Sequence, residues 1–332
     1  MVVAPVSSTM EVNCAGCAGC CLDWRPLVDG PDGTGSLEGS DHERRGPHVP
    51  LDDTYNLVAL SRDEVRAFLE AGLGDALTVR LWDAGAEGDA GDTENTEDAD
   101  ETAPTENAED TYTDELEIDG HRLASIAGRP AFFVGLRKPP KPVAPFDREE
   151  HAWLPTCVFL DPATLQCRIH DDDLYPSECA EYPAHNLALE RETECERVET
   201  AFGGERLLDD DPGETEGLLL GPQAIGQKVF TYPRPEALTG VVDRVARGEL
   251  TREDSAEFVA IAAASSPGTL ATSESHYEEA KTQALEADSW IGRSIRAWEQ
   301  LAERDESPDE AVSTDFEEAH GAPETPGWDA LE

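Results

Sequence analysis

Residues 14–21 read Cys-Ala-Gly-Cys-Ala-Gly-Cys-Cys and place four thiols in one short stretch near the N-terminus. Gly16 and Gly19 let the backbone turn tightly without a Cβ penalty, so the three cysteines spaced by two residues can face one metal ion or one cluster edge. Adjacent side chains tend to diverge, so Cys20 and Cys21 can bind one ion only if the backbone turns sharply between them. The pair therefore indicates two neighbouring sites, or one site and a thiol with another role.

Four more cysteines occur between residues 157 and 195 and bring the total to eight. We expect a hairpin between Cys157 and Cys167, with its turn at residues 161–164, and two prolines that stiffen the loop around Cys179. Zinc takes four ligands and a cubane iron–sulfur cluster takes four thiolates, so eight thiols suit two zinc or iron sites or up to two clusters. The expected metal ligands are Cys14, Cys17, Cys20, Cys21, Cys157, Cys167, Cys179 and Cys195. His170 and His185 are the alternatives if one thiolate is missing.

The charge of the chain is strongly negative, with 72 acidic residues against 25 basic ones and a formal net charge of −47. Only four basic residues are lysines, and this balance resembles proteins from a salt-saturated cytoplasm. Concentrated salt shortens the Debye length to a few Å and relieves the self-repulsion of such a chain. We therefore predict that the protein needs molar salt to stay folded.

The same composition bears on partners and location. Nucleic acid is not expected as a partner, because phosphate binding depends on Lys and Arg clusters that the sequence lacks. No apolar run approaches the roughly 20 residues that span a bilayer, and no secretory signal is seen, so we expect a cytoplasmic protein that does not bind membranes. In a reducing cytosol, clustered cysteines are more often metal ligands or redox thiols than disulfides.

The remaining patterns predict an α+β fold: a small, irregular, metal-stabilised cysteine-cluster domain with a short β-hairpin or sheet, and a helical C-terminal region. A capping box at Ser61–Glu64 starts a helix over 61–72, and residues 115–136 predict two or three strands with a tight hairpin. Further helices are expected over about 235–247, 251–264 and 274–303. The predicted division is 1–83 and 115–200 for the two halves of the cysteine-cluster domain, 84–114 for a disordered acidic insert, 215–304 for the helical region and 305–332 for an acidic tail.

The cysteine spacing resembles a known family. Its signature is matched by Cys14, Cys17, Cys20 and Cys21, and its second half by Cys157, Cys167, Ile169, Pro176, Cys179, Tyr182 and Pro183. This pattern is similar to the YkgJ-like cysteine cluster family, also described as a zinc- or iron-chelating CxxCxxCC domain. His170 and Tyr175 depart from it, standing where an aromatic residue and an arginine are usual, and Cys195 stands where some members carry an eighth cysteine. The resemblance covers about residues 14–195 and implies metal binding but no established reaction.

Two functions follow as hypotheses. The first is a metal-binding protein in which thiolates from two remote segments chelate zinc or iron. The alternative is an iron–sulfur oxidoreductase or electron-transfer protein. A dithiol oxidoreductase using Cys20 and Cys21 is disfavoured, because such motifs normally accompany a βαβ pattern that is not seen here. The sequence contains no GxGxxG, HExxH or GxSxG motif, so it leaves open whether the chain is an enzyme and whether it has a protein partner.

Overall fold

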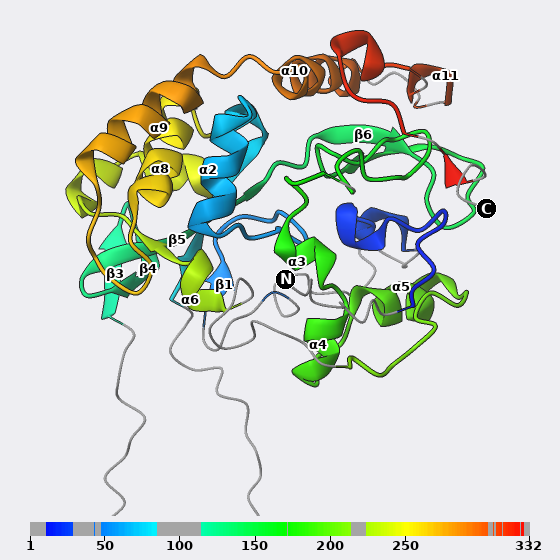
Figure 1. The fold of residues 1–332 in the computed structure, drawn as a ribbon, viewed down its shortest axis with the longest axis horizontal. Helices are drawn as coiled ribbons and strands as arrows, with labels where there is room; N and C mark the ends of the chain where they lie inside the picture. The colour runs from blue at the N-terminus through cyan, green and yellow to red at the C-terminus, as the bar shows by residue number, and fades with distance from the viewer. Residues whose placement is uncertain are drawn as a thin grey trace, which may run out of the picture.

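The computed structural model is an α+β fold in which a curled antiparallel sheet with its helices lies beside a less regular half that contains the cysteines (Figure 1). The α+β class is therefore as predicted. None of the helices within the described ranges is long and apolar enough to cross a membrane. The structure describes residues 11–28, 43, 48–84, 114–170, 172–213, 224–304, 308, 310–313, 315–325 and 327–328.

The larger sheet has the strand order β1-β2-β4-β5-β8, with β3 beside β4 and a direct pairing of β2 with β5. At its centre β2 pairs with β5 in antiparallel register, from Leu77 opposite Leu136 to Leu81 opposite Phe132. The predicted strands and tight hairpin over 115–136 are confirmed by β3, β4 and β5. The strand bounds are β1 Val49–Pro50, β2 Leu77–Asp83, β3 Asp114–Ile118, β4 His121–Ile126, β5 Arg129–Leu136 and β8 Phe230–Thr231.

Helices cover this sheet. The first, α2 (Arg62–Glu70), begins with the predicted capping box, in which Ser61 accepts from the Glu64 amide and the Glu64 carboxylate accepts from the Ser61 amide. It packs against α8 (Arg252–Ala264) and α9 (Glu274–Glu286), and α8 also contacts β2 and β5. The smaller helices here are the 3₁₀ turn η3 (Gly74–Ala76), α6 (Ile225–Lys228), η4 (Pro235–Leu238) and α7 (Val241–Ala246). The C-terminal helices therefore complete the sheet half of the fold.

Two expected helices are interrupted. The segment predicted as one helix over 274–303 forms α9 and α10 (Trp290–Ala302), because the Asp75 carboxylate accepts hydrogen bonds from the amide and hydroxyl of Ser289, at 3.0 and 2.5 Å, and Ser289 caps a new helix. The segment over 235–247 is divided at Gly240, which has a φ of 75°. The helix over 251–264 is confirmed, with its capping box at Thr251 and Asp254.

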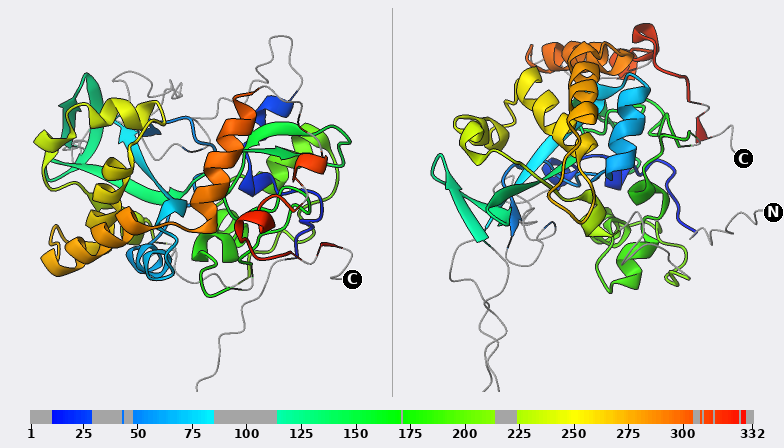
Figure 2. Two further views of the ribbon diagram at one scale, coloured as in Figure 1. Left: turned by 90° about the horizontal axis from the view of Figure 1, so that it is seen from above. Right: turned by 60° about the vertical axis from the view of Figure 1, so that its left-hand side comes forward.

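The cysteine half contains a second sheet of two strands, β6 (Pro140–Val143) and β7 (Ala152–Pro155), formed where a proline-rich run leaves the main sheet after β5. Its other elements are the 3₁₀ turns η1 (Gly19–Cys21) and η2 (Arg25–Leu27) and the helices α3 (Ser177–Ala180), α4 (Ala184–Ala188) and α5 (Glu194–Phe202). Helix α10 contacts both η3 and β6, so it bridges the two halves, as Figure 2 shows. One hydrophobic core cluster runs through both halves.

The end of the chain returns to the cysteine half. Two short elements, α11 (Glu310–Ser313) and η5 (Glu318–His320), lie near β6 and α10. The Phe316 ring stacks on Trp298, with 3.7 Å between ring centroids. The described part of the expected acidic tail is thus packed against the fold, whereas the predicted acidic insert, apart from Ala84 and Asp114, lies outside the described residues.

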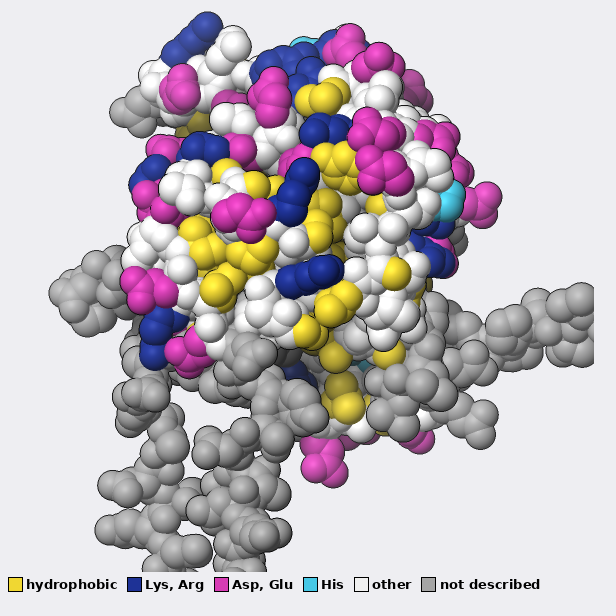
Figure 3. Space-filling model, turned by 90° about the vertical axis from the view of Figure 1, so that its left-hand side faces the viewer, with side chains coloured by type: hydrophobic (Ala, Val, Ile, Leu, Met, Phe, Trp, Pro, Cys, Tyr) yellow, Lys and Arg dark blue, Asp and Glu magenta, His cyan; other side chains and the backbone are white. Residues whose placement is uncertain are grey.

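Charged side chains on one face of the molecule can be followed in Figure 3. On that face Lys and Arg side chains stand among Asp and Glu side chains around an apolar stretch. Positive charge on this face is therefore interspersed with negative charge.

Candidate metal centre

The N-terminal cysteines lie on a tight turn. The amide of Cys17 donates to the Cys14 carbonyl at 3.1 Å, and the amide of Cys21 donates to the Ala18 carbonyl at 2.9 Å. Gly16 and Ala18 both adopt a positive φ, of 64° and 52°, which turns the chain between successive thiols. The sulfur atoms of Cys20 and Cys21 are 3.9 Å apart. The short spacing thus keeps the four cysteines on one turn, where the sulfurs of Cys20 and Cys21 are neighbours.

Helix α5 brings Cys195 to this turn. The helix starts with a capping box at Thr193 and Glu196, which places Cys195 in its first turn. It packs on η1 closely enough that a Cβ built on Gly19 would lie 2.7 Å from Val198 Cγ2. Only glycine fits at that position without movement, so the glycine that separates Cys17 from Cys20 also allows the helix to approach.

A buried carboxylate lies between this turn and the core. Glu194, next to Cys195, is 3 % exposed, and its Oε1 accepts from the Trp24 indole and, at 2.9 Å, from the Tyr55 hydroxyl. The Tyr182 hydroxyl accepts from the Glu194 amide. These contacts fix the first turn of α5, and with it the position of Cys195. Glu194 could not be identified from the sequence, because its partners come from distant segments.

The second cysteine segment is joined to the first through the backbone. The amide of Cys157 donates to the carbonyl of Cys21 at 2.7 Å, and Leu22 forms an antiparallel bridge with Thr156. A second bridge, between Leu160 and Cys167, closes the expected hairpin. At its turn the Asp161 carboxylate accepts from the amides of residues 163 and 164. Segments more than a hundred residues apart in sequence therefore meet at Cys21 and Cys157.

Cys179 reaches the same place from α3. The Tyr175 hydroxyl donates to the Cys179 carbonyl at 3.4 Å, and the thiol lies within electrostatic range of Cys157, Cys167 and Cys20. The two histidines considered as substitute ligands contact tyrosine rings: His170 lies 4.9 Å from Tyr175 and His185 lies 5.8 Å from Tyr182, measured between ring centroids.

Most of these thiols hold their protons strongly. Burial, together with charge at neighbouring cysteines, raises the pKa of Cys14 and of Cys167 to about 12 and that of Cys17 to about 11. Although Cys14 as a whole residue is exposed, the surrounding protein desolvates its sulfur. Desolvation also raises the pKa of the thiols of Cys157, Cys179 and Cys195. The hydrogen bond between the adjacent pair lowers the pKa of Cys20 and raises that of Cys21.

Two of the four lysines lie at the thiols. Lys138 lowers the pKa of Cys20 and Cys157 as a minor influence, and its buried Nζ has no hydrogen-bond partner among the described residues. Lys141 is close enough to Cys157 and Cys167 to act in the same direction. In a chain so poor in lysine, this placement supplies positive charge where thiolates would form.

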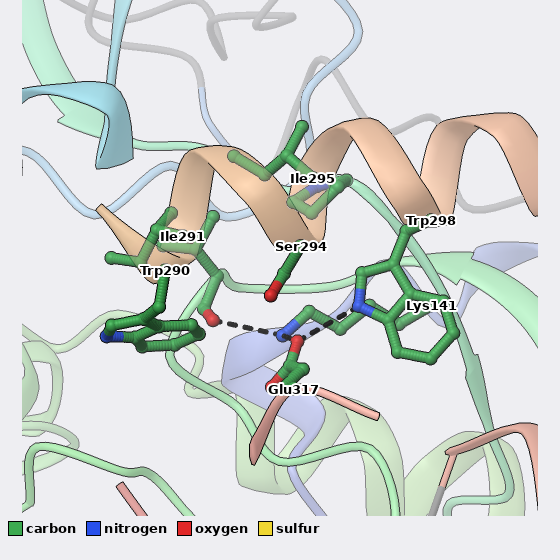
Figure 4. Close-up of a pocket in the computed structure, with 9 residues that line it drawn as sticks. Lys141, Trp290, Ile291, Ser294, Ile295, Trp298 and Glu317 are labelled. Carbon is green, nitrogen blue, oxygen red and sulfur yellow. Dashed lines mark hydrogen bonds and ion pairs between the residues drawn. The ribbon is translucent and has the colours of Figure 1, made fainter. Parts of the chain in front are cut away.

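Lys141 also ties the second cysteine segment to the end of the chain. Its Nζ donates to the carbonyls of Val158 and Leu160, at 3.0 and 2.7 Å, and pairs with Glu317 at 2.6 Å. Figure 4 shows Lys141, Glu317 and Trp298 meeting beneath α10. Glu317 further pairs with Arg168 at 3.0 Å, so a buried ion network supports the residue that follows Cys167.

The thiols gather without forming a finished ligand shell. Within the described ranges, no three His, Cys, Asp or Glu side chains already meet at a spacing that could hold a metal ion. The eight cysteines are all free, with Cys17 and Cys157 buried, Cys14 and Cys20 exposed and the others in between. Metal binding would therefore require the side chains to turn inward.

Comparison with known proteins places the chain in a family but gives no activity. No curated protein and no solved structure matches it. A family model described as a family of unknown function, DUF7531, matches residues 10–329, almost the whole chain. The chain therefore belongs to the DUF7531 family.

Proposed function

We propose that this protein binds zinc or iron through cysteine thiolates supplied by the N-terminal turn and by the segment from Cys157 to Cys195. The observation that carries the proposal is the hydrogen bond from the Cys157 amide to the Cys21 carbonyl, which joins the backbones of the two cysteine segments at a cysteine of each. The likeness to the YkgJ-like cysteine cluster family supports the same proposal, because that resemblance implies metal binding.

The chemistry of the donor set favours a cation here. The protonated thiols are desolvated and lie near one another, so ionising several of them without a counter-charge would be costly. A bound metal ion supplies that charge and makes thiolates the stable form. The buried Nζ of Lys138 has no hydrogen-bond partner among the described residues. An ammonium group beside Cys20 and Cys157 is balanced by negatively charged sulfur, so Lys138 also favours thiolates at this place.

Metal binding at this place would also stabilise the fold. A metal held by both segments would close a loop of more than a hundred residues between Cys21 and Cys157. In this arrangement the chain's own residues hold the thiols in place: Glu194 fixes the start of α5, and Lys141 fixes the hairpin between Cys157 and Cys167.

Elemental analysis with an absorption spectrum tests the proposal. The protein should be purified anaerobically in molar KCl, and zinc and iron measured per chain. We expect a colourless protein with stoichiometric zinc, or iron with the visible absorption of thiolate–iron sites. A brown protein with labile sulfide would favour the iron–sulfur alternative. A protein that contains neither metal, and takes up neither when zinc or ferrous iron is added under reducing conditions, would refute the proposal.

A further inference from the structure

We propose that the eight thiols form two separate four-thiol sites, divided by the peptide bond between Cys20 and Cys21. This inference rests on the proposed function. The first set is Cys14, Cys17, Cys20 and Cys195, and the second is Cys21, Cys157, Cys167 and Cys179.

The first set is built by the turn and by α5. The backbone hydrogen bond from Cys17 to Cys14 keeps these two residues on one side of the turn, and the packing of α5 on η1 brings Cys195 to the same side. The electrostatic neighbours of the Cys195 thiol are the sulfurs of Cys20, Cys14 and Cys17. Arg206 lies within range of Cys14 and Cys17 and provides positive charge on this side.

The second set is built by the hairpin and by α3. The carbonyl of Cys21 accepts the Cys157 amide, and the Leu160 bridge to Cys167 holds the other side of the hairpin. Apart from Cys20, the neighbouring thiols of Cys21 are Cys157 and Cys167, and both belong to the second set. Cys179 lies in range of Cys157 and Cys167 and also of Cys20, which in turn is in range of Cys167. Here the positive charge comes from Lys138 and Lys141.

Cys20 and Cys21 separate the two sets. Their sulfurs are 3.9 Å apart and adjacent in the chain, so they are close enough for two sites to be neighbours. Four thiolates complete the coordination of zinc, and eight thiols therefore fill two such sites with none left over. Cys20 is also within range of Cys157, so the competing arrangement is one large cluster in which all eight thiols mix.

Three double variants distinguish these arrangements. Each removes two thiols: Cys14→Ser/Cys195→Ser takes both from the first set, and Cys14→Ser/Cys167→Ser takes one from each. Zinc is added to the reduced proteins in molar KCl, and bound zinc is measured after gel filtration. The wild-type chain should hold about two zinc ions, the first double variant about one and the second close to none. The double variant Cys167→Ser/Cys179→Ser takes both thiols from the second set, so it should again bind about one zinc ion.

Protection of the wild-type thiols covers the case in which a variant does not fold. The protein is loaded with one equivalent of zinc, alkylated without denaturant, and digested for mass spectrometry. The thiols of one set should become protected together, while those of the other set remain reactive. Equal zinc loss in the within-set and cross-set double variants, or protection spread evenly over all eight thiols, would overturn the division while leaving metal binding intact. A wild-type chain that binds no zinc and no ferrous iron would instead refute the proposed function itself.

Discussion

Replacement of Glu317 by Gln removes a negative charge that the fold buries against two cations. The Glu317 side chain is inaccessible to solvent, and its carboxylate lies 2.6 Å from Lys141 Nζ and 3.0 Å from Arg168 Nε. Gln keeps the volume and can still accept from the Trp298 indole. Breaking a buried ion pair by removing one partner costs about 3–5 kcal/mol, because the other charge stays buried. Lys141 keeps two carbonyl acceptors and Arg168 keeps two other carboxylates, so we expect the lower end, about 3 kcal/mol.

Urea unfolding in molar KCl, followed by tryptophan fluorescence, measures this effect without changing the ionic strength. The matched control is Glu318→Gln. Glu318 is the next residue and also pairs with Arg168, at 2.5 Å, but its side chain is 21 % exposed. Because water reaches Glu318 and Arg168 keeps the carboxylates of Asp161 and Glu317, this replacement should cost less than that of Glu317, about 1 kcal/mol. If Glu317→Gln and Glu318→Gln lowered the free energy of unfolding equally, burial of the Glu317 carboxylate beneath α10 would not stabilise the fold through Lys141 and Arg168.

Four further predictions concern charge, protons and packing. With a net charge of −47, the melting temperature should rise steeply from dilute to molar KCl; a melt that does not move would exclude the salt requirement. Zinc loading at pH 7.5 should release about four protons per ion, measured with an indicator dye, because the metal-free thiols are protonated. The same raised pKa values predict that the metal-free fold loses stability as the pH rises from about 9 through 12, because the thiols of the unfolded chain ionise first. Urea unfolding at a series of pH values measures this, and a stability that increased over this range would contradict the raised pKa values. Gly19→Ala should lower both stability, by about 1–3 kcal/mol, and zinc content, because it separates α5 from η1. Gly226→Ala lies in a helix and its Cβ meets nothing within 4 Å, so it should lower neither. An equal loss in the two variants would argue against the close packing of α5 on η1.

Local signals predicted much of the fold. The capping boxes at Ser61 and Thr251 start helices where expected, because both partners of each box lie within four residues. The break between α9 and α10 could not be predicted, since the apolar stripe continues across it and Asp75 comes from the other end of the chain. The same holds for Glu317: in an acidic, proline-containing segment nothing local marks one carboxylate as the partner of Lys141.

In the candidate site, too, only the features that depend on neighbouring residues could be predicted. Spacing alone placed four thiols on one turn and predicted the hairpin from Cys157 to Cys167. The assignment of Cys195 to the first set depends on α5 packing against Gly19. The role of Lys138 depends on the path of the chain after β5, which brings this lysine to Cys157. These are long-range contacts, and sequence spacing carries no information about them.

X-ray absorption at the metal edge of the protein purified in molar KCl tests metal binding by these thiols most directly. We predict a first shell made of sulfur alone, at about 2.3 Å for zinc. A first shell of nitrogen and oxygen, with the eight thiols still open to alkylation, would contradict metal binding by the cysteines.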